Sequence, residues 1–227
     1  MNNHAKYAEV RHLLDTGDVV FFVRLTIPQA YRQGWRGIGG YLSNLAICLA
    51  QYRAGETFDG AHEAIHCGCI IRDEDDGGLY LMEFTAGRRG AGLRRLSEVI
   101  ANYTGTVVVK PLDATSKGKV RTDIVQAWLR DHRLDSYRLV GLAFPTLNHV
   151  RGWAWRGAMF CSEAVISLLQ RLEVVPVARP VLRGCRMIMD RIMPHWYSPK
   201  EVWNLPQLDG SEAIVFNGGL RDVGKSQ

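Results

Sequence analysis

The sequence predicts one α+β domain, and three features support that prediction. Its 227 residues, 47% hydrophobic and 22% charged, have the composition of an ordinary globular protein that can bury a full core. Short runs rich in β-branched and aromatic residues predict strands, two of which flank the strong turn sequence of 73–78. Residues 161–172 have the apolar periodicity of an amphipathic helix. Without a repeat or a linker, this mixture predicts a single unit over residues 1–227.

The individual elements follow from local composition. Strands are expected where β-branched and aromatic residues cluster, at 19–23, 65–72, 79–85, 105–110 and 213–216. Helices are expected where apolar residues run long or recur at helical spacing, at 41–52, 96–103, 122–130 and 161–172. The strands at 65–72 and 79–85 form a hairpin around the acidic turn. Ser198-Pro199 opens a short turn or helix near the end of the chain.

Charge and composition restrict the classes of function. A net charge of +5 and a pI near 9.0 favour anionic partners such as cell-wall polymer, although no specific nucleic acid is expected. The basic residues are scattered except for Arg88, Arg89, Arg94 and Arg95, which we interpret as a solvated loop that can attract an acidic substrate. No apolar run has the roughly 18 residues of a membrane span, and the polar N-terminus lacks a secretory signal. We therefore expect synthesis in the cytoplasm, with reduced cysteines.

Cys161 is the most informative single position. It begins the predicted amphipathic helix and lies on its apolar stripe. The free backbone N–H groups and the dipole at a helix N-terminus favour a thiolate, which is a nucleophile. A buried cysteine acting as a small core residue is the alternative interpretation.

The predicted hairpin offers a base for this thiol. His66 lies in its first strand and Glu83 in its second. A register that places the two directly opposite, or as diagonal neighbours, puts both side chains on one face of the sheet, where the carboxylate can orient the imidazole. A shift by one residue separates them. A charge within the apolar run around Glu83 also needs a partner.

These residues, in this order, resemble the circularly permuted NlpC-type papain-like proteins, and most closely their YiiX-like branch. The resemblance is carried by short motifs from about residue 13 to residue 205: Gly17-Asp18, His66-Cys67-Gly68, Glu83, Phe160-Cys161-Ser162-Glu163 and Ser198-Pro199. It implies a papain-like fold with the nucleophile helix packed on an antiparallel sheet. It also implies Cys161 as nucleophile, His66 as general base and acid, and Glu83 as the orienting residue. Residues 28–60 are then an insertion, and Cys67 replaces an expected aliphatic residue.

A second motif competes with this assignment. His62-Glu63-Ala64-Ile65-His66 matches the H-E-x-x-H signature of zinc metallopeptidases, whose two histidines must share one face of a helix. Loop-like composition precedes the motif and a strand-like run follows it, so a helix here would be too short to hold a metal. We expect neither a metal nor a cofactor.

The sequence therefore predicts a cysteine hydrolase that cleaves an amide through Cys161, His66 and Glu83 by way of an acyl-enzyme. The resemblance, which includes wall-cutting enzymes, and the basic charge imply peptide in the cell wall as the preferred substrate, which requires delivery in a virion or to the envelope. Trp153 and Trp155 can line the cleft or pack in the core. The alternatives are an intracellular amidase, a (thio)esterase or a deconjugating peptidase of the same fold, the zinc metallopeptidase, and a non-catalytic binding or virion module. The oligomeric state is left open.

Overall fold

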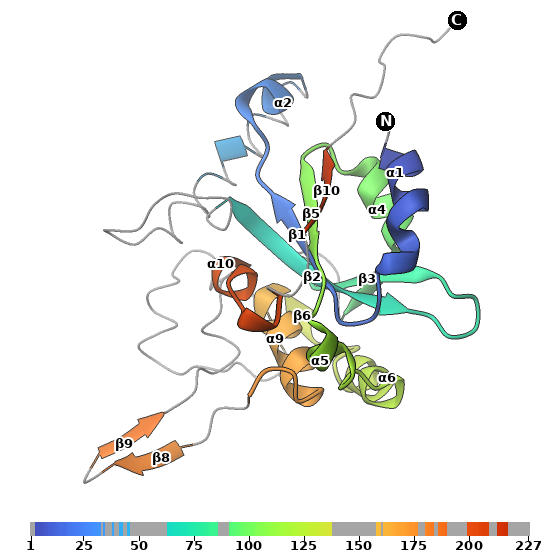
Figure 1. The fold of residues 1–227 in the computed structure, drawn as a ribbon. Helices are drawn as coiled ribbons and strands as arrows, with labels where there is room; N and C mark the ends of the chain where they lie inside the picture. Colours follow the sequence, from blue (N-terminus) through green and yellow to red (C-terminus); the bar gives the residue numbers. More distant parts are fainter. Residues whose placement is uncertain are drawn as a thin grey trace, which may run out of the picture.

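A six-stranded antiparallel sheet is the centre of the fold (Figure 1). The structure, a computed structural model, describes residues 3–32, 63–85, 91–137, 158–159, 161–176, 180–183, 186–189, 199–208 and 213–217, and the single positions 34, 38, 41, 42 and 45. Over these residues the protein is a mixed α+β fold, which confirms the predicted class at that level.

The strands of the sheet lie in the order β10-β5-β1-β2-β3-β4. Their bounds are Val19–Val23 (β1), Ala64–Arg72 (β2), Leu79–Glu83 (β3), Gly92–Arg95 (β4), Thr106–Lys110 (β5) and Ile214–Asn217 (β10). β1 and most of β2 are buried on both faces, which explains their nearly continuous apolar sequences. These two central strands carry Phe22 and His66, which lie opposite each other at the candidate site.

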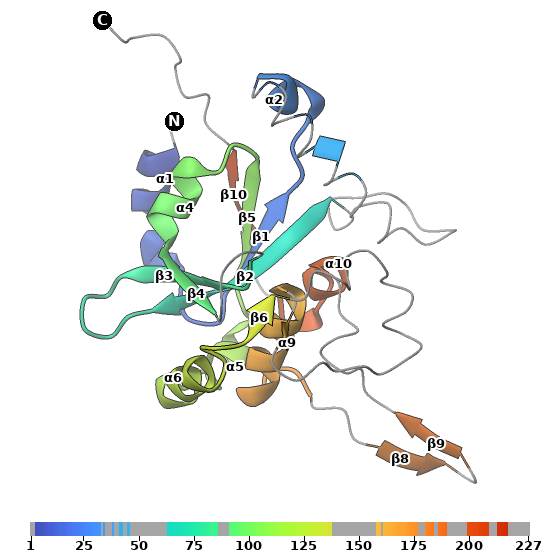
Figure 2. The ribbon, with the colours of Figure 1, turned by 180° about the vertical axis from the view of Figure 1, so that it is seen from behind.

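Helices cover both faces of the sheet and enclose two apolar clusters (Figures 1 and 2). On one face lie α1 (Asn3–Val10) and α4 (Leu96–Asn102). On the other, α9 (Cys161–Arg171) and α10 (Pro199–Trp203) contact β2, and α6 (Thr122–Asp131) packs on α9. Helix α9 is therefore the one that brings Cys161 to the sheet.

The smaller elements complete the described chain. They are η1 (Arg11–Leu13), α2 (Ile27–Arg32), α5 (Ala114–Lys117), η3 (Pro206–Leu208), the parallel pair β6 (Ser136–Tyr137) and β7 (Ala158–Met159), and the hairpin of β8 (Pro180–Arg183) and β9 (Arg186–Met189). Among the described residues, every helix is too short or too polar to cross a bilayer.

Most predicted elements are confirmed within one or two residues, but the interpretation of the arginine cluster was wrong for its two described members. Arg94 and Arg95 belong to strand β4 instead of a solvated loop, because residues 92–95 pair with β3. The polar N-terminus forms α1, which packs on α4. Pro28 lies in the first turn of α2, where a proline costs no hydrogen bond.

Other predictions lie outside the described residues. These include most of the insertion at 28–60 and most of the helix at 41–52, where only positions 41, 42 and 45 are described and are helical. Arg88, Arg89, Trp153, Trp155 and Ser198 also lie outside them. Pro199 begins α10, as the predicted turn or helix at this point requires.

Candidate active site

The register of the β2–β3 hairpin sets the distance between His66 and Glu83. Cys69 lies opposite Met82, so Glu83 falls level with Gly68, and His66 is its diagonal neighbour on the same face. His66 Nε2 lies 2.9 Å from Glu83 Oε2. Of the two registers that the sequence allowed, the diagonal one is formed.

Gly68 makes this diagonal contact possible. A Cβ at this position would lie 2.6 Å from the Met82 carbonyl oxygen, 2.7 Å from Leu81 Cδ1 and 3.3 Å from the Glu83 Cβ. The first of these is a backbone atom and cannot move without disturbing the strand. The glycine therefore lets β3 approach β2 closely where the Glu83 side chain crosses toward His66.

Both neighbours of the His66–Glu83 pair come from adjacent strands. Phe22 lies opposite His66 on β1, with the two ring centroids 5.3 Å apart. On β4, Arg94 donates from Nε to Glu83 Oε1 at 2.6 Å, and its Nη2 forms an ion pair with the same oxygen. A row of side chains from four strands thus fixes the imidazole and the carboxylate.

Cys161 approaches this row from α9. It is the first residue of the helix and is only 5% exposed. Its sulfur lies near enough to the side chain of His66, and to the side chain and backbone of Cys67, for each of them to shift its pKa. Glu83 occupies His66 Nε2, which leaves Nδ1 as the ring nitrogen available to the sulfur. The three residues singled out in the sequence therefore lie together.

An irregularity in β2 lies directly beside this contact. Phe22 pairs with His66 but Val23 pairs with Ala64, so the register shifts by one residue between them. Such bulges increase the local twist and re-aim side chains. The Cys161 sulfur meets two consecutive side chains, His66 and Cys67, at this end of β2, although consecutive residues of a regular strand point to opposite faces.

The environment favours an ion pair between thiolate and imidazolium. The Cys67 hydrogen bond does most to lower the pKa of Cys161; together with the charge and hydrogen bond of His66 it outweighs burial, and the pKa lies well below its ordinary value. Burial by itself lowers the pKa of His66, but the Cys161 thiolate and Glu83 reverse this effect and raise it to about 10. Between these two pKa values, sulfur and ring are both charged.

Glu83 is ionised although its side chain is only 4% exposed. Burial raises the pKa of this carboxyl, but the hydrogen bond and charge of His66 and the charge of Arg94 prevail and lower it below its ordinary value. A carboxylate at this depth needs such partners, because an unpaired buried charge is costly.

The two neighbouring thiols have the opposite character. Burial, together with its contact with Cys161, raises the pKa of Cys67 well above its ordinary value. Burial and the charge of Asp18 raise the pKa of Cys69 to about 12. Of the free cysteines in the described part of the chain (Cys67, Cys69 and Cys161), Cys161 is thus the one prepared to react.

The rival zinc motif does not form a helix over its described residues. Glu63 lies in a turn and pairs with Arg24, its Oε1 2.9 Å from Nη2, while Ala64 and His66 belong to strand β2. His62 lies outside the described residues. The described part of this motif therefore lacks the helical face that two zinc-binding histidines at this spacing require.

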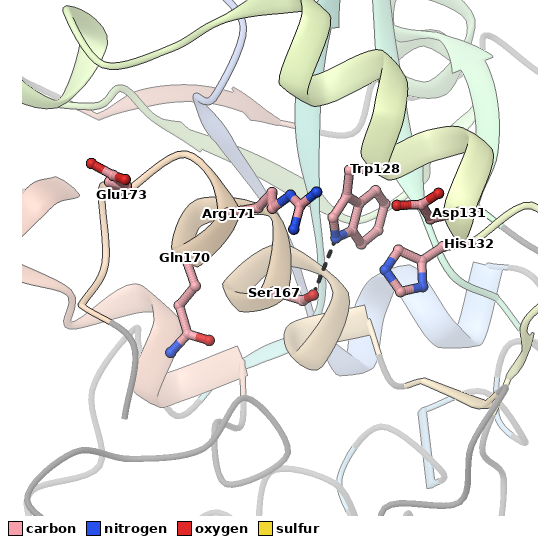
Figure 3. A pocket seen from close by; sticks show the side chains of 7 residues that line it. All are labelled: Trp128, Asp131, His132, Ser167, Gln170, Arg171 and Glu173. Atoms are coloured by element: carbon pink, nitrogen blue, oxygen red, sulfur yellow. Dashed lines mark hydrogen bonds between the residues drawn. The ribbon is translucent and has the colours of Figure 1, made fainter. Parts of the chain in front are cut away.

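A pocket of about 500 Å³ lies elsewhere, between α6 and the C-terminal half of α9 (Figure 3). Its lining residues are Trp128, Asp131, His132, Ser167, Gln170, Arg171 and Glu173. Several of their polar groups are already paired: Trp128 Nε1 donates to Ser167 Oγ at 3.1 Å, and His132 Nδ1 lies 2.6 Å from Asp135. Gln170 and Glu173 lie away from the other side chains, and the charges are of both signs (Figure 3). This pocket does not include Cys161, His66 or Glu83.

Sequence reasoning missed three contributors to the site, namely Arg94, Gly68 and the Cys67 side chain. Residues 92–95 alternate between half-buried and exposed in the structure, so Arg94 and Arg95 point to opposite faces of the strand, but the sequence Gly-Leu-Arg-Arg shows no such alternation that could have predicted it. In comparisons with known proteins, no family model and no curated sequence matches this chain.

Proposed function

We propose that this protein is a cysteine hydrolase with a permuted papain-like fold of the NlpC type. The observation that supports it is the proximity of Cys161 to His66, which shifts the pKa of both groups, together with the 2.9 Å distance from His66 Nε2 to Glu83. A sulfur at a helix start, an imidazole and an orienting carboxylate have the relation of nucleophile, base and third member that acyl transfer uses.

The reaction begins with the thiolate–imidazolium pair. The Cys161 sulfur attacks the carbonyl carbon, a C–S bond forms, and the carbonyl electron pair moves to oxygen. The N–H groups at the start of α9 are suited to hold that oxyanion, with the Cys161 N–H as one donor. When the intermediate collapses, the bond to the leaving group breaks and the His66 imidazolium gives it a proton.

Hydrolysis of the acyl-enzyme restores the site. Neutral His66 takes a proton from water, the hydroxyl attacks the acyl carbon, and the C–S bond breaks to release a carboxylic acid and the thiolate. Glu83 holds the ring in one orientation and stabilises its charged form throughout. No other group has to change its protonation state in this scheme.

An amide in cell-wall peptide is the substrate we favour. The protein carries a net charge of +5, which suits the anionic polymers of the wall, and the family it resembles contains wall-cutting enzymes. In this setting the protein acts after delivery in a virion or to the envelope. An intracellular amide, ester or thioester would undergo the same chemistry.

Acyl-enzyme formation tests the proposal without knowledge of the natural substrate. With p-nitrophenyl acetate, we expect a burst of nitrophenolate and one acetyl group on the peptide that contains Cys161. Purified peptidoglycan should then release soluble fragments with new amino groups. Cys161→Ser and His66→Ala should lose both signals and keep the fold. Acetylation that is equal at Cys67 or Cys69, or unchanged in His66→Ala, contradicts a hydrolase and favours the binding module.

A further inference from the structure

The two oxygens of the Glu83 carboxylate have different partners. Oε2 lies 2.9 Å from His66 Nε2. Oε1 accepts a 2.6 Å hydrogen bond from Arg94 Nε and is also paired with Arg94 Nη2. Two donors of one rigid guanidinium on a single oxygen restrict rotation of the carboxylate, so the direction in which Oε2 points is set from the Arg94 side.

The strands place these three residues in a row. Arg94 on β4 lies opposite Leu81, and Glu83 lies opposite Gly92, so Arg94 and Glu83 are diagonal neighbours on one face. His66 on β2 and Glu83 on β3 are also diagonal neighbours, on the same face of the sheet. The row His66–Glu83–Arg94 therefore crosses three adjacent strands.

This ion pair differs from an ordinary surface pair. Arg94 is 39% exposed but Glu83 only 4%. Exposed pairs contribute little because water screens them and both side chains lose freedom. Here one partner is a buried carboxylate, whose negative charge needs a positive partner, and His66 contacts only one of its two oxygens. The contact with Arg94 completes the pairing of Glu83.

We propose that Arg94 is a positioning residue of the active site, which acts on Cys161 and His66 only by holding the Glu83 carboxylate ionised and aimed at the ring. This inference rests on the proposed function, and it assigns Arg94 no contact with substrate. It replaces the interpretation of Arg94 as part of a basic loop that attracts acidic substrates.

Arg95 supplies a matched control. It is the next residue of β4, carries the same charge, lies opposite Tyr80 and is exposed. Arg94→Ala and Arg95→Ala therefore change the net charge equally and differ in the contact with Glu83. Arg94→Lys keeps the charge but loses the forked pair of donors.

The first measurement is iodoacetamide labelling of Cys161 as a function of pH, with thermal unfolding as a check of the fold. We expect Arg94→Ala to label about tenfold more slowly near pH 7, the size of one lost charge-assisted hydrogen bond. Its acid limb should shift to higher pH, because the Glu83 carboxyl without its guanidinium protonates more readily. Arg94→Lys should lie between, and Arg95→Ala within twofold of the unchanged protein. A profile of Arg94→Ala that overlays that of Arg95→Ala overturns the inference.

The sign of a second shift separates positioning from simple repulsion. If Arg94 holds Glu83 in place, its removal lowers the pKa of His66, measured by NMR titration of the ring. If its positive charge only repels the imidazolium, removal raises that pKa, and the inference is wrong. In a Glu83→Gln background, Arg94→Ala should change labelling by less than twofold, since its route of action is already gone.

These outcomes are distinct from failure of the proposed function. If Cys161 of the unchanged protein labels no faster than Cys69 and forms no acyl-enzyme, the hydrolase is excluded. The His66 titration still decides whether Arg94 positions Glu83 in that case. If Cys161 is reactive but its labelling is the same in the Arg94 and Arg95 variants, the inference about Arg94 is wrong and the proposed hydrolase still stands.

Discussion

In the described part of the protein, a buried carboxylate lies near a buried cysteine in two regions, and these have opposite electrostatics. In one, Asp18 accepts hydrogen bonds from the backbone N–H groups of Asp15 and Leu112, at 2.8 and 2.9 Å, and its charge helps to raise the pKa of Cys69. In the other, Glu83 pairs with His66, and the pKa of Cys161 is lowered.

The difference lies in what stands between the acid and the sulfur. At Cys161 an imidazole separates the two anions, so the carboxylate stabilises the imidazolium, which in turn stabilises the thiolate. At Cys69 no imidazole of the described residues affects the thiol, and the carboxylate opposes its ionisation directly. Burial raises the pKa of Asp18 itself, whereas His66 and Arg94 overcome burial at Glu83. Asp18 accepts hydrogen bonds from backbone N–H groups and pairs with Lys117, whereas the partners of Glu83 are the side chains of His66 and Arg94.

The largest expected effect is the contrast between the two thiols themselves. At pH 7 iodoacetamide should label Cys161 more than about 1,000-fold faster than Cys69, because only the thiolate reacts. Labelling should persist below the ordinary thiol pKa, where Cys161 is still ionised. Hydrolysis also needs the imidazolium, so it should fall as the pH rises through about 10. Peptide-resolved mass spectrometry checks the rates. Equal labelling of Cys69 and Cys161 would contradict the proposed difference in the ionisation of the two thiols.

Removal of Asp18 should affect stability but leave reactivity unchanged. Asp18→Ala leaves the N–H groups of Asp15 and Leu112 without their acceptor, which should cost about 2–4 kcal/mol in the free energy of unfolding. Urea titration measures this loss. The pH profile of Cys161 labelling should match that of the unchanged protein under native conditions. A shifted profile would mean that Asp18 also acts on the site.

Glu83→Gln should have the converse effect. The amide keeps the shape but loses the charge-assisted hydrogen bond to the imidazolium, so Cys161 labelling near pH 7 should fall roughly 10- to 100-fold, or about 1.4–2.7 kcal/mol. Because the pKa of Glu83 is lowered, its stabilising effect is present above about pH 4.5 and is lost as the pH falls further. Labelling and unfolding measured from pH 3 to 8 test both statements. An unchanged labelling rate would assign Glu83 a structural role like that of Asp18.

A methyl group at Gly68 should disturb the contact between Glu83 and His66 and leave the hydrogen bonds of Asp18 intact. In Gly68→Ala the new Cβ meets the Met82 carbonyl oxygen at 2.6 Å, and we expect a loss of about 1–2 kcal/mol in unfolding free energy together with slower Cys161 labelling. Gly118→Ala is the control, since its new Cβ finds no atom nearer than 3.5 Å. Equal behaviour of the two variants contradicts a requirement for close approach of β2 and β3.

Much of this site was predictable because its residues lie in elements with strong local signals. The periodicity of 161–172 predicted a helix that begins at Cys161, and the acidic turn at 73–78 predicted the hairpin of His66 and Glu83. Strand alternation restricted that pair to two registers on one face. By contrast, the glycine-rich stretch before Arg94 favoured a loop, and residues 92–95 form a strand because β3 provides a partner.

The sequence by itself determined the order of the elements, the apolar faces that must be buried, and which residues carry reactive groups, because periodicity and turn chemistry act over a few neighbouring residues. Only the tertiary structure decided the shift in β2 beside His66, the reach of Cys67 to the Cys161 sulfur, and the contact of Arg94 with Glu83. These depend on the relative placement of α9, β2, β3 and β4, and the balance between burial and charge that sets each pKa exists only when those elements are packed together.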